Sequence, residues 1–110
     1  MMKTKRFAYV WQYTVDPQYR AKVFAAYRPD GDWAKLFLRD PEYIETKLFQ
    51  ECDHSDRFMT VDYWASKSAR DSFRERFAVE FREIDERCEN YTLDETLIGD
   101  YFIIGEGAAQ

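Results

Sequence analysis

The sequence predicts an α+β fold of the ferredoxin-like class, in which a four-stranded antiparallel sheet carries helices on one face. Its hydrophobic segments occur in the order strand, helix, strand, strand, helix, strand. The chain has 110 residues, which suits one domain with one core. Aromatic residues make up 18% of it, a load that favours either a large buried core or a pocket that stacks on a planar molecule.

The first strand and the first helix follow from alternation and from capping signals. Residues 7–15 alternate, and both faces are largely apolar, which is typical of a central strand covered on both sides. Asp16 and Pro17 then suit the N-cap and the first position of a helix. Pro29 and Gly31 interrupt that helix, so we expect two helical pieces with a kinked loop between them.

A hairpin follows the broken helix. Residues 43–52 predict the second strand, with Ile44 and Thr46 on one face and charged side chains on the other. Such a charged face suits an edge strand, where it discourages unwanted pairing. Residues 53–56 are a polar turn, and residues 58–65 predict the third strand.

The second helix is predicted by an apolar stripe at helical spacing. A serine caps its start, and its opposite side, which includes Arg70, is charged and expected to face solvent. The stripe consists of Phe73, Phe77, Phe81, Ile84 and Cys88. We therefore expect one amphipathic helix.

The last strand is expected over residues 96–104. The chain is read as a single domain, 1–110, with a core over 7–104 and a disordered tail at 105–110. Two helices cover only one face of a four-stranded sheet, and right-handed crossovers place the first and third strands at its centre. The other face then exposes an apolar surface, so we expect a homodimer that packs sheet to sheet. Alternation alone does not say which face of each strand meets the helices.

Composition excludes several classes of partner. The net charge of −5 argues against nucleic acid, because phosphate binding needs clustered Lys and Arg. No run of 18 apolar residues predicts a membrane span, and the basic N-terminus leads into an alternating strand and not a signal core. We expect a cytoplasmic protein. Cys52 and Cys88 are far apart and predict two buried thiols, not a disulfide.

Metal and nucleotide chemistry find little support in the sequence. His54 is the only histidine and lies in the polar turn at residues 53–56, where solvent exposure is expected. We predict no metal site. No glycine-rich phosphate loop is present, so no nucleotide cofactor is predicted, and a single histidine leaves no Ser–His or Cys–His pair.

Two segments carry a family resemblance. Residues 27–37 read YRPDGDWAKLF, and residues 62–66 read DYWAS and lead into a helix. With these segments, residues 7–103 resemble the antibiotic-biosynthesis-monooxygenase-like proteins of the dimeric α+β barrel superfamily. The resemblance implies a homodimer with a pocket between sheet and helices in each protomer. Characterised relatives include cofactor-free oxygenases that act on phenols or quinols.

Other relatives degrade haem, and this chain resembles them only in part. Their motif uses an Asn on the first strand, a Trp at the end of the third strand and a His on the second helix. Trp64 matches the Trp, but the first strand has no Asn and the second helix has no His. The resemblance therefore implies a protein without haem, and we predict no cofactor.

Asp62 is the candidate catalytic residue. It lies among apolar strand neighbours, where a carboxylate needs a partner or a raised pKa. It could take the proton of a phenol, which prepares the ring to give an electron to dioxygen. The alternative is a structural partner for an arginine or a tyrosine hydroxyl.

Six aromatic residues are candidates for binding a planar substrate, either as pocket walls or at the entrance beside Gly31. Each can equally be ordinary core packing. They are Trp64, Trp33, Tyr27, Trp11, Phe73 and Phe77. The aromatic stripe of the first strand, which includes Trp11, would line the pocket if it faced the helices and would otherwise lie in the core or at a dimer interface.

Three functions remain open at this stage. The first is a cofactor-independent monooxygenase-like protein that acts on a small aromatic, phenolic or quinol molecule. The second is a non-catalytic homodimer that binds a small molecule in the same pocket. The third is a structural module whose pocket is filled by its own aromatic side chains.

Overall fold

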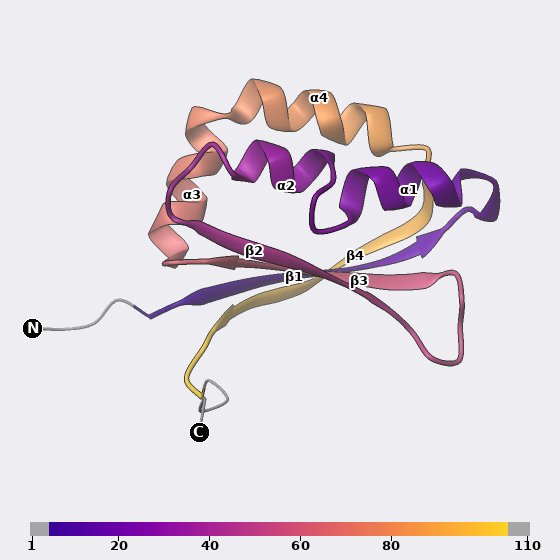
Figure 1. The fold of residues 1–110 in the computed structure, drawn as a ribbon, viewed down its shortest axis with the longest axis horizontal. Helices are drawn as coiled ribbons and strands as arrows, with labels where there is room; N and C mark the ends of the chain where they lie inside the picture. The colour runs from indigo at the N-terminus through magenta and orange to yellow at the C-terminus, as the bar shows by residue number, and fades with distance from the viewer. Residues whose placement is uncertain (1–4, 106–110) are drawn as a thin grey trace, which may run out of the picture.

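The sheet has four antiparallel strands in the order β2-β3-β1-β4, and all the helices lie on one of its faces (Figure 1). This computed structural model describes residues 5–105. The elements, in chain order, are β1 (Phe7–Val15), η1 (Pro17–Tyr19), α1 (Arg20–Tyr27), α2 (Asp32–Phe37), β2 (Tyr43–Gln50), β3 (Arg57–Trp64), α3 (Lys67–Arg76), α4 (Ala78–Cys88) and β4 (Thr92–Phe102). The order and the layers confirm the predicted α+β fold.

β1 and β3 occupy the centre of the sheet, as the right-handed crossovers predicted. β2 is an edge strand, in keeping with its charged outer face. β4 is longer than expected, because its pairing with β1 already begins where Val15 meets Thr92. Of the predicted tail, only Gly105 lies within the described residues.

Strand register sets which side chains share the helix-covered face. Two rows matter for the site. In one, Thr46, Asp62, Tyr9 and Asp100 follow each other across all four strands; in the next, Leu48, Thr60, Trp11 and Leu97 do. Because pairing partners in a sheet point to the same side, the aromatic stripe of β1 faces the helices.

An irregularity at the start of β2 changes the predicted face assignment there. Tyr43 pairs with Trp64, and Glu45 pairs with the adjacent Tyr63. Ile44 therefore has no partner on β3 and is the extra residue of the irregularity. Tyr43 and Thr46 are therefore buried, while Ile44 is exposed. The expected placement of Ile44 beside Thr46 was wrong.

The first helix is broken, as predicted. The Asp16 side chain accepts a hydrogen bond from the backbone N–H of Gln18 (3.1 Å) and caps η1, which continues into α1. The chain then turns at Gly31, which approaches the end of α1 closely. A Cβ atom at Gly31 would lie 2.6 Å from the carbonyl oxygen of Ala25, so only glycine fits there.

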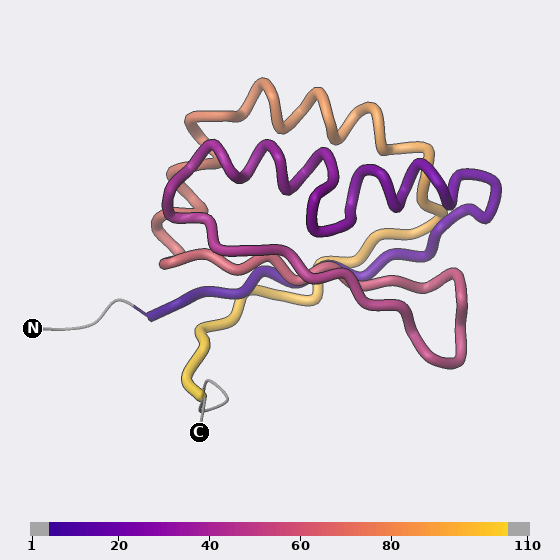
Figure 2. Tube along the Cα trace, viewed as in Figure 1, coloured from indigo at the N-terminus to yellow at the C-terminus, as the bar shows by residue number. Residues whose placement is uncertain are grey.

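The second helix is also broken, which the apolar stripe did not predict. Phe77 has φ −111° and ψ 29° and separates α3 from α4, and the two pieces run in different directions (Figure 2). The backbone ladder nevertheless continues, since Phe77 donates to Phe73 and Phe81 donates to Phe77, both at 2.9 Å. The side-chain spacing therefore survives a change of direction. Ser66 caps α3 by accepting from Ala69 (3.1 Å).

Arg70 does not face solvent, contrary to expectation. Its side chain is buried, and its guanidinium lies 4.3 Å from the ring centroid of Tyr9 and 4.8 Å from that of Phe7. It forms an ion pair with Asp100 of β4 (2.9 Å) and another with Asp71 (2.9 Å). The cation–π contacts and the pairing with carboxylates together offset the free-energy cost of burying the guanidinium charge.

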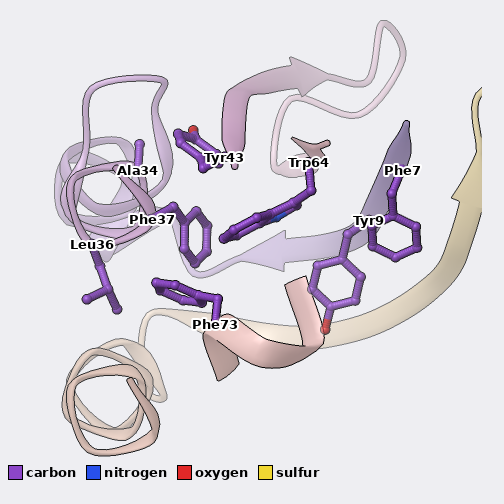
Figure 3. Packing of buried hydrophobic residues seen from close by; sticks show 8 residues of the cluster. All are labelled: Phe7, Tyr9, Ala34, Leu36, Phe37, Tyr43, Trp64 and Phe73. Carbon is purple, nitrogen blue, oxygen red and sulfur yellow. The ribbon is translucent and has the colours of Figure 1, made fainter. Parts of the chain in front are cut away.

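The core on the helix side is mostly aromatic. Figure 3 shows part of it, with Phe37 of α2 and Phe73 of α3 packed around the indole of Trp64. The ring centroid of Trp64 lies 5.6 Å from that of Phe37 and 5.1 Å from that of Phe73. These contacts fix the helix pieces to the end of β3.

The opposite face of the sheet carries no helix. Its centre is a small apolar cluster of Ala8, Val10 and Val61, with Met59, Tyr63 and Ile103 packed around it. The centre of this face is apolar, as the sequence predicted, whereas Glu45 and Lys47 of β2, which pair with Tyr63 and Val61, place charges along its edge. Of the two free cysteines, Cys88 is buried as expected but Cys52 is exposed in the hairpin turn, so that part of the prediction was wrong. None of the helices within residues 5–105 is long and apolar enough to cross a bilayer.

Candidate functional site

A cavity of about 260 Å³ lies between the sheet and the helices. Side chains of β1, β2 and β3 form its floor, and side chains of α1, α2 and α4 cover it. Charged residues from α3, α4 and β4 stand at its mouth, where β4 is exposed along most of its length. The cavity therefore has mainly aromatic walls, a few polar groups on its floor and charges at its opening, an arrangement typical of small-molecule sites.

Asp62 is the buried acid of the cavity floor. Its side chain accepts a hydrogen bond from the Thr46 hydroxyl (2.6 Å), and that hydroxyl is also 2.6 Å from the hydroxyl of Tyr43. Burial raises the pKa of Asp62 to about 7, and the Thr46 hydrogen bond and the charge of Arg70 oppose part of that rise. A carboxyl group with this pKa can both accept and return a proton near neutral pH.

A second polar pair lies beside Asp62 on the floor. The hydroxyls of Tyr13 and Thr60 are 3.0 Å apart and both are buried. Burial raises the pKa of Tyr13 well above its usual value, so its hydroxyl stays protonated and available as a hydrogen-bond donor. The floor thus offers one proton acceptor and one neutral hydroxyl pair.

Aromatic rings form the walls. Trp11 stacks on Tyr13 with 18° between the ring planes, and Trp33 meets Phe81 edge to face at 4.7 Å. Burial raises the pKa of Tyr27, and the nearby indole N–H of Trp33 opposes part of that rise. The same N–H is buried and makes no hydrogen bond of good geometry with any described residue. Planar walls of this kind favour a flat ligand.

The mouth carries charges of both signs. Arg74 of α3 donates to the Tyr9 hydroxyl (3.3 Å) and forms one side. Asp85 of α4 and Glu95 of β4 form the other, and Glu95 has a pKa raised by partial burial and by the nearby charge of Asp85. The opening is therefore electrostatically polarised.

The structure brings together four of the seven predicted site residues. Asp62, Trp11, Trp33 and Tyr27 all line the cavity. The other three, Trp64, Phe73 and Phe77, are not among its lining residues. Trp64 and Phe73 are almost completely buried behind Phe37, and the Phe77 ring stacks on Phe73 (4.8 Å).

Sequence reasoning did not single out the residues that tune Asp62. Thr46 was placed on one face of its strand without a role, and Arg70, whose charge lowers the pKa of Asp62, was expected in solvent. The signal for Thr46 is the hairpin register, because counting back from the turn at residues 53–56 sets Thr46 opposite Asp62. Arg74 was read as part of a solvated helix face, and only the tertiary structure brings it to the mouth.

The described residues contain no cluster of three or more His, Cys, Asp or Glu side chains suited to hold a metal ion. His54 is exposed in the hairpin turn, as expected.

The chain has the same α+β fold as solved structures described as a cofactor-independent oxygenase and as antibiotic biosynthesis monooxygenases. It is similar over 96% of its length to SnoaB, a cofactor-independent oxygenase from Streptomyces nogalater, with a TM-score of 0.73, 19% identity and 99% of that chain covered. A protein from Bordetella bronchiseptica, named provisionally as an antibiotic biosynthesis monooxygenase, matches 93% of this chain and 100% of its own, with a TM-score of 0.71 and 14% identity.

A further match is a Bacteroides thetaiotaomicron protein of unknown function, described as a possible oxidoreductase. It covers 91% of this chain and 99% of its own, with a TM-score of 0.68 and 14% identity. No family model matches the sequence, and no curated protein matches it. At these identities the comparisons establish the fold alone.

Proposed function

We propose that this protein is a cofactor-independent monooxygenase that oxidises a small phenol or quinol in the cavity. The observation that carries the proposal is a carboxyl group with a pKa of about 7, that of Asp62, on the floor of an aromatic cavity. Buried acids tuned in this way are typical of catalytic sites. The similarity to SnoaB, a cofactor-independent oxygenase, supports the same reaction class.

The reaction follows from what the cavity residues offer. The Asp62 carboxylate accepts the proton of the substrate hydroxyl, and the resulting phenolate gives one electron to dioxygen. The phenoxyl radical and superoxide combine at a ring carbon, and Asp62 returns its proton to the peroxide. Loss of water then breaks the O–O bond, so one oxygen atom enters the ring as a carbonyl and the other leaves with two substrate hydrogens. An aromatic enclosure that excludes water protects the reactive intermediates.

The size of the cavity limits the substrate. An apolar protein cavity of roughly 150 Å³ holds benzene. The volume here is about 260 Å³, which suits one ring or two fused rings with their hydroxyl groups. Larger polycyclic molecules would have to extend through the mouth.

The test is Asp62→Asn, assayed for turnover and for binding. We expect oxygen consumption with small quinols and naphthols to fall at least about a hundredfold, the usual size of a general-base contribution, while ligand binding is kept. Asp53→Asn, the same change in the exposed hairpin turn, serves as the matched control and should leave turnover unchanged. Full activity in Asp62→Asn would remove the carboxyl group from the mechanism.

The second candidate is a non-catalytic homodimer that binds the same ligands. The buried Thr46–Asp62 hydrogen bond favours it, because it also satisfies Asp62 in a purely structural role. Tight binding of phenols by the wild-type protein without any oxygen consumption would support this alternative and contradict the oxygenase proposal.

We further propose that two chains pack through the uncovered sheet face. Its apolar centre has no covering layer within the described residues, and dimers of this kind bury such a surface. Phe49→Asp places a charge at an exposed position of this face, opposite Met59 on β3, and should convert a dimer to a monomer in light scattering. Leu38→Asp, at an exposed site on the helix side, is the control and should stay dimeric. A monomeric wild-type protein at micromolar concentration would contradict the proposal.

A further inference from the structure

Arg74 differs from its neighbours on the same helix. Arg70 forms an ion pair with Asp100 (2.9 Å), and Arg76 forms one with Asp40. Arg74 stands between them in sequence and lines the cavity mouth, yet it forms no ion pair with any residue in the described range 5–105. It is thus a cation aimed at the cavity without a protein anion to match it.

The contacts of Arg74 hold its head group in place at the mouth. Its guanidinium lies over the ring of Phe81, 5.0 Å from the centroid, and near that of Tyr9 at 5.8 Å. Among the described residues only the Tyr9 hydroxyl accepts a hydrogen bond from it, at 3.3 Å. A guanidinium has five N–H donors, so a planar pair of them remains for a ligand.

The opposite side of the mouth is negative. Glu95 pairs with Tyr13 across β1 and β4, and Tyr13 is four residues beyond Tyr9, which corresponds to roughly 13 Å along a strand. Asp85 lies near Glu95 and raises its pKa. An anionic ligand group is therefore attracted to the Tyr9 end of the mouth and repelled from the Tyr13 end.

We propose that the natural ligand is a hydroxylated aromatic acid whose carboxylate is bound by Arg74. The inference rests on the function proposed above and names its substrate class. Asp62 is the pairing partner of Tyr9 on β3, so a ligand reaching from Arg74 to Asp62 spans roughly the length of the Tyr9 side chain. A single aromatic ring, with a carboxylate at one end and a hydroxyl at the other, has this length and meets both conditions. In Figure 3 the Tyr9 hydroxyl points toward α3, the helix that carries Arg74.

The test compares 4-hydroxybenzoate with its methyl ester by isothermal titration calorimetry. The two probes share ring and hydroxyl and differ in charge. A charge-assisted contact with a guanidinium should make the acid bind wild-type protein at least about tenfold more tightly. Arg74→Gln should weaken the acid to the level of the ester without changing the ester, and Arg74→Lys should retain part of the preference. Arg82→Gln removes the same charge from an exposed site of α4 outside the cavity and should behave as wild type.

Three results would overturn the inference: equal binding of acid and ester by the wild-type protein, binding of neither, or equal loss of preference in Arg74→Gln and Arg82→Gln. Equal binding of acid and ester, or equal loss of preference in the two variants, leaves the oxygenase proposal intact as long as the probes are turned over. Selective binding of the acid without oxygen consumption would support the role of Arg74 and contradict the oxygenase proposal. Near-ultraviolet circular dichroism of each variant checks that the aromatic core is intact.

Discussion

Replacing Asp62 with asparagine should stabilise the folded protein at alkaline pH. Burial raises the pKa of this carboxyl from 3.8 to about 7. Between these values the folded state holds a proton that the unfolded state has released, so stability falls as the pH rises through that window. The full effect is about 4 kcal/mol, because each pKa unit is worth about 1.4 kcal/mol. Asparagine keeps an oxygen that can accept from Thr46 but carries no charge to bury.

The assay is urea unfolding of wild type and variant at pH 5 and pH 8, at one protomer concentration, since a dimer's stability depends on it. With pKa values of 3.8 in the unfolded state and about 7 in the folded state, the free energy of unfolding of Asp62→Asn relative to wild type should rise by about 2.5 kcal/mol from pH 5 to pH 8. The comparison of variant with wild type cancels the titration of every other group. If the advantage were the same at both pH values, Asp62 would not titrate in this window and the argument for a buried base would fail.

Two further perturbations test the site and the fold. Thr46→Val removes the hydrogen bond that lowers the pKa of Asp62, so the rise of activity with pH should move to higher pH; Thr60→Val, which affects the other hydroxyl pair, should leave that midpoint in place. Gly31→Ala should cost at least about 2 kcal/mol in thermal or urea unfolding, because the new methyl group would collide with backbone carbonyls of α1, whereas Gly105→Ala meets nothing and should be neutral. An unchanged midpoint for Thr46→Val, or a stable Gly31→Ala, would refute the corresponding contact.

Local patterns predicted the order of the elements well, because each signal lies within a few residues. Asp16 and Gly31 mark helix boundaries by capping and by a close approach of the backbone, and both act where expected. The alternation of β1 predicted a central strand. It did not identify the helix-facing side, since both faces are apolar and only pairing with neighbouring strands decides between them.

The errors arise where one residue changes the phase of a pattern or where a contact is distant in sequence. Ile44 is the extra residue of an irregular strand, which alternation does not register. The stripe through Phe77 keeps its spacing because the backbone ladder continues across the bend. Arg70 of α3 was expected in solvent because its partners, Tyr9 of β1 and Asp100 of β4, are distant from it in sequence.

The candidate site was predictable in its chemistry more than in its geometry. An acid among apolar strand neighbours singled out Asp62, and the aromatic content favoured either a large core or a pocket, both of which the structure contains. The division of rings between cavity and core was not accessible, because Trp11 and Trp64 have the same local character and only the position of Phe37 separates them. Arg74 reaches the cavity through the direction of α3, which no local pattern encodes.

β1 contributes side chains to both faces of the sheet, and this has an evolutionary consequence. Odd-numbered residues from Phe7 to Val15 face the ligand side, while Ala8 and Val10 belong to the bare side of the sheet. Removing a single residue near the middle of this strand would exchange the two sets over half its length and damage both surfaces at once. Point substitutions can vary one surface without the other, so lineages of this protein should diversify at β1 by replacement and hardly ever by insertion or deletion.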